Sequence, residues 1–434
     1  MKKDNTQTKK ARRGLYILIT AVLTISAFVG GFFVNRLFTF SATPKINSVL
    51  EIIDKKSLYK NEMTDDQLAK ALADILLVRD EYAHYYTEDE YDTRKRQDSG
   101  DFSGTGISFL IDNEGNPIIE KGVYSVMKNS PAFNAGIKSG DVITAGKIEN
   151  GDFISFINNK ELLEFLNGIK ENEKVTFKID REDEFKDRQI SLIKSEYTVS
   201  YVTYYDNQNT VYFDYENNDQ AKQSSFKISA FPDDTALVVL EQFSGNCAKE
   251  FEQVMKVFTE RNKSKLILDL RNNGGGFLTD LTKIASYLID SDGKNKLPVA
   301  YSKNSEGLVK YTTPKNNFVK DIEKIVVLAN QNTASASECL IGAMLYYGKG
   351  FSIDNLVLTS FNYERQTYST YGKGIMQTTF NLASGGALKL TTAQILWPDK
   401  TTCINDVGIV QNNRRNCVAD KIAITRALEI LQAD

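Results

Sequence analysis

The spacing of hydrophobic and polar residues divides this chain into stretches with different predicted structures. Residues 15–34 form a run of twenty residues without a charged side chain. At about 1.5 Å per residue, a helix of that length is long enough to cross a bilayer. Residues 43–96 carry leucine and isoleucine at helical intervals, and Thr64-Asp65-Asp66 is typical of a helix start. A helical region is therefore predicted there.

The pattern changes to that of a small β domain over residues 97–198. Short apolar runs of β type occur there, for example at residues 106–111 and 175–179. Between them, Pro131 can open a short helix that Gly136 can end. The stretch is therefore predicted to consist of strands interrupted by one or more short helices.

Strands and helices alternate through residues 199–434. The predicted strands are apolar runs of the buried type, at residues 236–240, 266–270 and 324–329. Each is followed by a predicted helix, at residues 247–259, 278–288 and 335–347. This alternation is typical of a layered βα core, in which sites tend to form at the strand ends.

Charge adds a feature at the N-terminus. The chain has 434 residues, 41% hydrophobic and 25% charged, which is ordinary for a globular protein of two or three domains. Residues 1–14 carry six basic side chains against Asp4, so the remainder of the chain is net acidic. An acidic remainder argues against nucleic acid as a partner.

The basic residues predict the orientation of the apolar run. They precede it, and only Arg36 follows closely behind, so the N-terminus is expected in the cytoplasm. Residues 1–14 are then a cytoplasmic tail, residues 15–34 an uncleaved signal anchor in the cell membrane, and the rest of the chain is extracytoplasmic. A cleaved signal peptide is the alternative, although residues 40–42 resemble a cleavage site only faintly.

Cysteine and histidine limit the possible chemistry. The chain has four cysteines, no C-x-x-C motif and one histidine, His84, so no metal site is predicted. Cys403 and Cys417 are close enough in sequence to pair across a loop, but their spacing leaves this open. His84 lies among tyrosines and is interpreted as part of an aromatic packing cluster, which makes a Ser-His-Asp triad improbable.

A serine activated by a lysine remains as candidate chemistry. Ser335 stands where a predicted strand gives way to a helix, and Lys373 lies between two glycines. Serine needs a base close to its hydroxyl, and lysine can serve if its ammonium is destabilised, usually by desolvation. Gln377 lies four residues after Lys373 and would share its face in a strand, where its amide can orient the lysine.

Acyl transfer also needs hydrogen-bond donors for an oxyanion. The backbone N–H groups of Gly275 and Gly276, after the strand at residues 266–270, are candidates, as is that of Ala336 at a helix N-terminus. Each feature has a structural alternative. The glycines can form a plain turn, and Ser335 can cap its helix with Glu338 completing a capping box.

Residues 130–143 resemble the signature of a PDZ domain. Residues 103–109 then stand where such a domain keeps its carboxylate-binding loop. Successive N–H groups there can bind the terminal carboxylate of a peptide, and the adjoining strand edge can pair with its backbone. The candidate binding residues are Gly104, Thr105, Gly106 and Ile107. The alternative is a glycine-rich start of a strand in a small β domain.

Taken together, these segments resemble the carboxyl-terminal processing peptidases, the tail-specific proteases of peptidase family S41. The resemblance runs from about residue 45 to residue 425 and rests on residues 83–91, 266–276, 333–338, 372–377, 385–393 and 406–409. It implies a multidomain protein of α+β and α/β parts. Its expected parts are the N-terminal transmembrane helix, a helical region at 43–96, a PDZ-like domain at 97–198 and a crotonase- or ClpP-like layered βα peptidase core at 199–434.

The resemblance also implies the roles of individual residues. Ser335 is the nucleophile, Lys373 the general base and Gln377 the residue that positions the base, whereas Ser337 is structural. The expected reaction is hydrolysis of peptide bonds near the free C-termini of protein substrates, without metal or any other cofactor. A catalytically impaired PDZ-bearing surface scaffold and a different hydrolase on the same core are the alternatives.

Some positions depart from the pattern of the family. The interval from Ser335 to Lys373 is longer than usual, with extra residues within 351–369. A second Gly-Lys-Gly triplet around Lys349 therefore competes as the source of the base, although Gln377 favours Lys373. Gly274 replaces the usual proline of the glycine loop, and Tyr346 stands where some members carry an aspartate.

Overall fold

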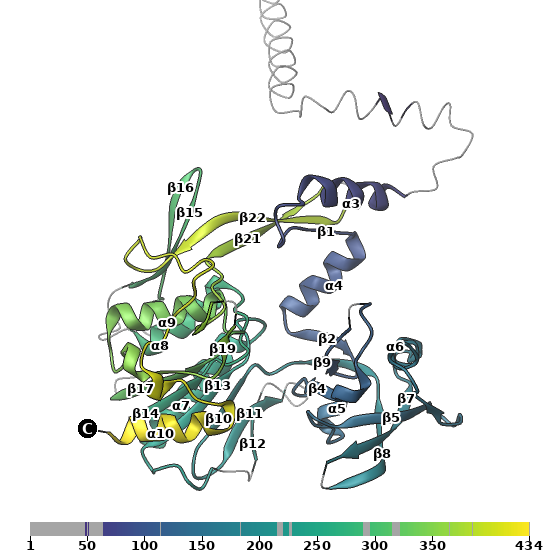
Figure 1. The fold of residues 1–434 in the computed structure, drawn as a ribbon, viewed down its shortest axis with the longest axis horizontal. Helices are drawn as coiled ribbons and strands as arrows, with labels where there is room; N and C mark the ends of the chain where they lie inside the picture. Colours follow the sequence, from purple (N-terminus) through teal and green to yellow (C-terminus); the bar gives the residue numbers. More distant parts are fainter. Residues whose placement is uncertain are drawn as a thin grey trace, which may run out of the picture. The chain divides into compact units, whose positions relative to one another are not determined.

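The fold is that of a computed structural model, shown in Figure 1. It describes residues 48–49, 51, 64–112, 114–182, 184–214, 220–224, 228–289, 296–314, 322–363, 365–383 and 385–433. The predicted basic tail and signal anchor, residues 1–34, lie outside the described residues. Among those that are described, no helix combines the length and the apolar character needed to span a membrane.

The chain divides into two compact units, residues 1–72 and 73–434. Helix α3 (Asp65–Leu76) crosses this division. The predicted helix start is confirmed, because Thr64 and Gln67 exchange hydrogen bonds between side chain and backbone at the N-terminus of α3. All further elements belong to the second unit.

The predicted helical region at 43–96 is interrupted by a strand. Strand β1 (His84–Tyr86) pairs antiparallel with β22 (Ala387–Leu396) before α4 (Glu88–Asp98) begins. The sequence did not predict this strand within the helical region, because its pairing with the distant β22 overrides the local pattern. The aromatic cluster is confirmed, since the rings of His84 and Tyr86 lie 4.4 Å apart.

Residues 107–193 form a small β module with its own hydrophobic core, which includes Val123, Ala132, Ile143 and Phe177. Its strands are β3 (Ile107–Phe109), β4 (Val123–Val126), β5 (Val142–Ile148), β6 (Ile154–Ser155), β7 (Lys174–Arg181) and β8 (Phe185–Ile193). Its helices are α5 (Pro131–Asn134) and α6 (Asn159–Gly168). Pro131 opens α5 as predicted, and Ser130 caps it through the N–H of Phe133.

Two short antiparallel strands flank the module in the sequence, one before it and one after it. Strand β2 (Asp101–Gly104) pairs with β9 (Ser195–Thr198), so the chain enters and leaves the module through adjacent strands. The loop from Gly104 to Ile107 therefore begins at the end of β2 and ends at the start of β3.

The largest sheet has seven strands in the order β12-β11-β10-β13-β14-β17-β18. They are β10 (Val202–Tyr205), β11 (Thr210–Asp214), β12 (Gln220–Ser224), β13 (Thr235–Leu240), β14 (Lys265–Asp269), β17 (Lys324–Ala329) and β18 (Leu356–Leu358). The last four are parallel, as expected for apolar runs that are buried on both faces.

Helices cover both faces of this sheet (Figure 1). A hydrophobic core lies on each face of the sheet. Side chains of β14 alternate between these two cores, with Leu266 and Leu268 in one and Ile267 in the other. The first core includes residues of α7 (Cys247–Glu260), α8 (Leu278–Leu288) and α9 (Ala336–Tyr347). The second includes residues of α10 (Ala423–Gln432). The result is the layered βα core that the sequence predicts.

A second sheet carries the segment that follows Lys373. It joins β1, β22, β15 (Pro298–Asn304) and β16 (Gly307–Thr312) in that order, and β21 (Ile375–Asn381) also pairs with β22. This sheet therefore brings residues from the beginning and the end of the unit together.

Candidate active site

Ser335 occupies a strained position between β17 and α9. It directly precedes the first residue of α9 and has a φ of 57° and a ψ of −115°. A non-glycine residue with positive φ is uncommon, and such strain costs on the order of 1–3 kcal/mol, which tends to be retained at functional sites. The buried hydroxyl of Thr333 donates to the Leu270 carbonyl and fixes the turn that leads to Ser335.

The glycine loop, residues 274–276, packs directly against Ser335. A Cβ atom added at Gly275 would lie 2.8 Å from the Cβ of Ser335 and from the backbone of Ala334 and Ala336. The Asn273 carbonyl accepts hydrogen bonds from the Ala334 N–H and the Ser337 hydroxyl, both at 3.0 Å. The structure thus brings loop and serine together, and it directs the buried Ser337 hydroxyl to a structural bond.

The N–H groups of the loop are directed differently from one another. That of Gly275 donates to the Asn273 side-chain oxygen at 2.9 Å, so in this structure it does not serve as the predicted oxyanion donor. A side-chain acceptor two residues earlier satisfies it. Among the described residues, no hydrogen bond engages the N–H of Gly276 or of Ala336. These two remain the candidate oxyanion donors.

Glu338 links the serine to the lysine. Its buried carboxylate accepts hydrogen bonds from the N–H of Ser335 at 2.9 Å and from that of Lys373 at 2.9 Å, through the same oxygen. Its other oxygen accepts from the Thr370 hydroxyl at 2.5 Å and the Gly372 N–H at 2.7 Å. Burial raises the pKa of Glu338, and these hydrogen bonds oppose the rise.

The sequence predicted only part of this role. It placed Glu338 in a capping box with Ser335, and the bond from the Ser335 N–H agrees with that prediction. The bonds to Thr370, Gly372 and Lys373 depend on tertiary contacts. The sequence held one signal of these further bonds: Glu338 is an acidic residue in a helix whose other buried residues are almost all apolar. A buried charge needs hydrogen-bonding or charged partners.

Lys373 lies just before β21, and its side chain is half-buried. Its Nζ is 4.3 Å from the ring centroid of Tyr82. Burial lowers the pKa of Lys373, nearby Lys389 adds to that direction, and Glu81 opposes it. No hydrogen bond joins Lys373 Nζ to the Ser335 hydroxyl within the described part of the chain.

Gln377 was predicted to share a face with Lys373 because side chains alternate along a strand, but this reasoning does not apply here. Lys373 precedes the strand, and β21 has an irregularity in its pairing between Met376 and Gln377, which breaks the alternation of faces. The Gln377 side-chain N–H donates to the Thr391 hydroxyl at 3.0 Å. No hydrogen bond between Gln377 and Lys373 is present among the residues that the structure describes.

The structure argues against Lys349 as the base. Lys349 follows Gly348, which ends α9 with a left-handed φ of 66°. Ser335 is at the other end of this helix of 12 residues, and a helix of that length is roughly 18 Å long. A base must reach the hydroxyl by hydrogen bonding, directly or through one water, so Lys349 is too far away.

The predicted carboxylate-binding loop lines a pocket in the β module. Gly104, Thr105, Gly106 and Ile107 all border it, together with Phe102, Ser103, Met127, Leu166, Lys194 and Tyr197. The carbonyls of Thr105 and Gly106 accept the N–H groups of Ala132 and Met127. Within the described chain, no acceptor engages the N–H of Thr105 or Gly106, and β3 pairs only with β4.

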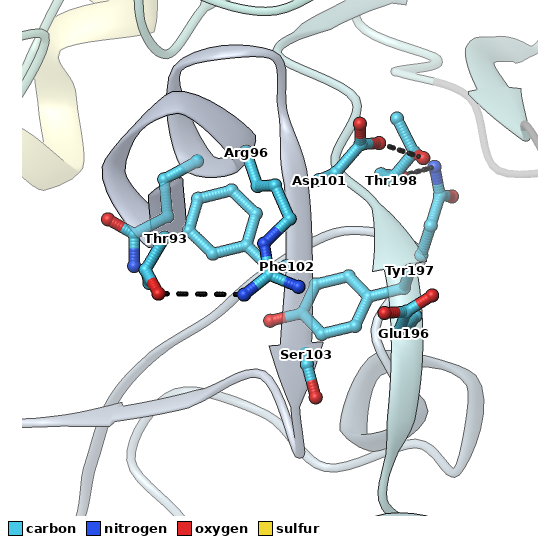
Figure 2. Close-up of a pocket in the computed structure, with 10 residues that line it drawn as sticks. Thr93, Arg96, Asp101, Phe102, Ser103, Glu196, Tyr197 and Thr198 are labelled. Atoms are coloured by element: carbon cyan, nitrogen blue, oxygen red, sulfur yellow. Dashed lines mark hydrogen bonds between the residues drawn. The ribbon is translucent and has the colours of Figure 1, made fainter. Parts of the chain in front are cut away.

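A second hollow, of about 420 Å³, lies next to this loop (Figure 2). It shares Phe102, Ser103 and Tyr197 with the loop pocket. In Figure 2, Arg96 of α4 donates to Thr93 at 3.5 Å, and the Thr198 hydroxyl donates to Asp101 at 2.7 Å. None of its lining residues belongs to the site around Ser335, so it is separate from the candidate chemistry.

The four cysteines are free thiols in the structure. Cys403 lies beside the backbone of the candidate base, with its Sγ 3.6 Å from the Gly374 carbonyl. The Sγ of Cys417 lies 3.7 Å from the Gln411 carbonyl. The pairing of Cys403 with Cys417 that the spacing left open is therefore not formed here.

A strained serine at a strand-to-helix turn, a glycine loop against it and a half-buried lysine are the features expected of a serine peptidase that uses no histidine. Residues 234–355 match the family described as peptidase family S41. A protein named "Probable CtpA-like serine protease" from Staphylococcus aureus (strain COL) is 31% identical over 391 residues, which cover 88% of this chain and 67% of that protein. This chain belongs to peptidase family S41.

Two further comparisons agree with this assignment. A protein of the same name from Staphylococcus saprophyticus subsp. saprophyticus is 27% identical over 404 residues, or 92% of this chain and 71% of that protein. A solved structure titled "Crystal structure of Putative S41 protease from Bacteroides fragilis NCTC 9343" matches with a TM-score of 0.50 and 14% identity. It covers 89% of this chain and 96% of that chain and shows a similar mixed α/β fold.

Proposed function

We propose that this serine peptidase is anchored in the cell membrane and cleaves extracytoplasmic proteins near their C-termini through Ser335 and Lys373. The observation that carries the proposal is the carboxylate of Glu338. One of its oxygens accepts the N–H groups of both residues, so the two backbone nitrogens lie within about 6 Å of each other, the sum of the two 2.9 Å bonds. Nucleophile and base are thus held together.

The reaction proceeds in two acyl-transfer steps. The Ser335 oxygen attacks the carbonyl carbon of the substrate while its proton passes to Lys373 Nζ. The N–H groups of Gly276 and Ala336 stabilise the oxyanion. The peptide C–N bond then breaks, and the Lys373 ammonium returns the proton to the leaving amine. Water, deprotonated by Lys373, then attacks the ester carbonyl carbon; the C–O bond to Ser335 breaks, and the Lys373 ammonium returns the proton to the Ser335 oxygen.

Gln377 positions the base in this proposal. The Thr391 hydroxyl donates its one proton to Asp80 at 2.8 Å, so it accepts from the Gln377 side-chain N–H. This fixes the amide orientation and leaves the Gln377 oxygen as the acceptor for the Lys373 ammonium.

The β module captures the substrate. The N–H groups of Thr105 and Gly106 bind the terminal carboxylate, the free edge of β3 pairs with the peptide backbone, and Leu166 and Met127 contact an apolar terminal side chain. Lys194, which also lines the pocket, adds positive charge near the carboxylate. Substrates are therefore proteins with free, apolar C-termini.

The membrane anchor rests on the sequence alone. Residues 15–34 cross the membrane, and the basic residues within 1–14 keep the N-terminus in the cytoplasm. Added protease should then digest the catalytic region in intact spheroplasts, while a tag at residue 1 stays protected. A tag that is digested from outside, or a catalytic region recovered in the soluble fraction, contradicts this part of the proposal.

The peptidase is tested by cleavage of an unstructured protein with an apolar C-terminus by the full chain in detergent. Ser335→Ala should abolish cleavage. Ser337→Ala is the matched control and should retain most of it, because the Ser337 hydroxyl is committed to the Asn273 carbonyl. Cleavage that survives Ser335→Ala refutes the assignment of the nucleophile. A wild-type chain that binds the substrate without cleaving it supports the scaffold alternative instead.

A further inference from the structure

A segment that precedes the β module reaches the candidate base. Tyr82 lies between α3 and β1, far from Lys373 in sequence, yet its ring centroid is 4.3 Å from Lys373 Nζ. The Tyr82 hydroxyl is 3.3 Å from that of Tyr371. The N–H of Tyr371 donates to the Thr333 carbonyl, two residues before Ser335. Tyr82 therefore contacts the base and, through Tyr371, is linked to the turn that carries the nucleophile.

Two fixed points hold Tyr82 in place. On one side, the Asp80 carboxylate accepts the N–H and the hydroxyl of Thr391 in β22, both at 2.8 Å, and also the N–H of Tyr82 at 3.2 Å. On the other side, β1 pairs with β22 through His84 and Lys389. Because both anchors are on one strand, the phenol ring has a defined position over the lysine.

We propose that Tyr82 is a positioning residue for Lys373, and that its ring covers the ammonium, excludes water and holds Nζ within reach of the Ser335 hydroxyl. This inference rests on the proposed role of Lys373 as base. An aromatic face attracts an ammonium in the charged form, an effect of about 0.5–2 kcal/mol. Loss of water from a buried lysine favours the neutral form by up to several pKa units, and we expect this larger effect to dominate.

The other charged and titratable groups around Lys373 act in known directions. Lys389 lowers the pKa of Lys373, and Glu81 raises it more weakly than burial lowers it. Burial, together with the contact to Tyr371, raises the pKa of Tyr82, so the Tyr82 phenol stays neutral at neutral pH. The Glu338 carboxylate is bound to the Lys373 backbone N–H.

The test measures the protonation of Lys373 directly, without peptidase activity. The full chain carrying Ser335→Ala is labelled with acetic anhydride between pH 6 and 11, and the Lys373 peptide is quantified by mass spectrometry, with exposed lysines of the same digest as reference. Tyr82→Ala should move the labelling midpoint of Lys373 upward by about one pH unit, because water can then hydrate the ammonium and stabilise the charged form. Tyr82→Phe should leave the midpoint in place, because the ring remains.

A matched control is available in α4. The ring of Tyr91 lies 4.8 Å from the Nζ of Lys95, and no hydrogen bond or ring contact joins Tyr91 to Lys373 among the described residues, so Tyr91→Ala should not move the midpoint of Lys373. In chains with Ser335 intact, the acid limb of kcat/KM should shift with Tyr82→Ala and not with Tyr82→Phe. Tyr82→Leu serves the same comparison if the alanine variant does not fold.

An unchanged midpoint in Tyr82→Ala or Tyr82→Leu overturns the inference. An equal shift in Tyr82→Phe also overturns it, since the hydroxyl and not the ring would then control Lys373. If the wild-type chain cleaves no substrate, the proposed function fails, but the labelling still decides whether Tyr82 covers Lys373. The two failures are thus distinguishable.

Discussion

At the scale of single residues, the site depends on a close approach that only glycine permits. Gly275 has a φ of 97°, and a Cβ there would meet backbone atoms of Ala334 and Ala336 at 2.8 Å. At Gly274, its neighbour, an added methyl group would have no atom within 4 Å, and the φ is not positive. The same chemical change therefore has different consequences at adjacent positions.

Gly275→Ala should lower kcat/KM by at least tenfold and destabilise the fold by roughly 1–3 kcal/mol, because the methyl group displaces the turn at Ser335 and strains the backbone. Gly274→Ala should change neither quantity appreciably. Cleavage kinetics and thermal unfolding of the full chain check both variants. Equal effects at the two positions would show that the contact with Ser335 is unimportant.

The two candidate lysines differ in their environment. Lys373→Met should abolish cleavage and leave the fold intact or more stable, because a half-buried ammonium that forms no ion pair with any described residue costs free energy. Lys349→Met should retain activity. If Lys349→Met abolishes cleavage and Lys373→Met does not, the assignment of the base is wrong.

The lowered pKa of Lys373 also predicts how stability depends on pH. Between that pKa and 10.5, the folded chain binds fewer protons at this site than the unfolded chain, so the free energy of unfolding rises with pH. Lys373→Met lacks this rise. Its stability relative to the wild type should therefore be highest below the lowered pKa and should decline toward pH 10.5. Urea unfolding at several pH values measures the difference, and a parallel pH dependence of both chains contradicts it.

At the scale of elements, the sequence predicted what local patterns determine. The apolar runs of β13, β14 and β17, the proline start of α5 and the capped start of α3 all follow from neighbouring residues. The strand β1 and the irregularity in β21 did not follow, because each depends on pairing with β22. Ser335, Lys373 and the glycine loop were recognisable by motif, whereas Tyr82 and the additional bonds of Glu338 arise only from tertiary packing.

The junction between the β module and the core contains an ion pair. Lys128, which follows β4, contacts Glu241, which follows β13, at 2.5 Å, and also donates to the Thr203 hydroxyl. Burial opposes the charge on Lys128, but Glu241, with smaller contributions from Tyr205 and Glu250, outweighs it, so the pKa of Lys128 is raised. The neighbouring Asn129 side chain donates to the carbonyls of Thr198 and Phe213. These bonds connect the module to the large sheet.

Glu241→Gln should destabilise the chain by roughly 1–3 kcal/mol, because it leaves the Lys128 ammonium without its partner. Lys128→Met combined with Glu241→Gln should recover much of that loss, since no uncompensated charge remains. A double-mutant cycle by urea unfolding measures the coupling. Additive effects of the two substitutions would show that the pair does not stabilise the junction.

At the scale of the whole molecule, the proposal requires two sites that act on one substrate. The loop from Gly104 to Ile107 offers N–H groups next to an edge of β3 that is unpaired among the described residues, whereas the proposed chemistry lies at Ser335 in the core. If the loop binds the terminal carboxylate, then replacing that carboxylate by an amide removes charge-assisted hydrogen bonds, each of which contributes about 1.5–3 kcal/mol. The bond that is cleaved remains the same.

A substrate with an amidated C-terminus should therefore show a KM at least tenfold higher than its free-acid form, with little change in kcat, because capture is weakened and the chemical step is not. Lys194→Met should reduce the difference between the two substrates, since Lys194 supplies positive charge to the pocket. Steady-state cleavage of a matched pair of peptides by the full chain measures both effects. Equal KM values for acid and amide in the wild type would remove the loop from substrate recognition and leave the cleavage chemistry at Ser335 unaffected.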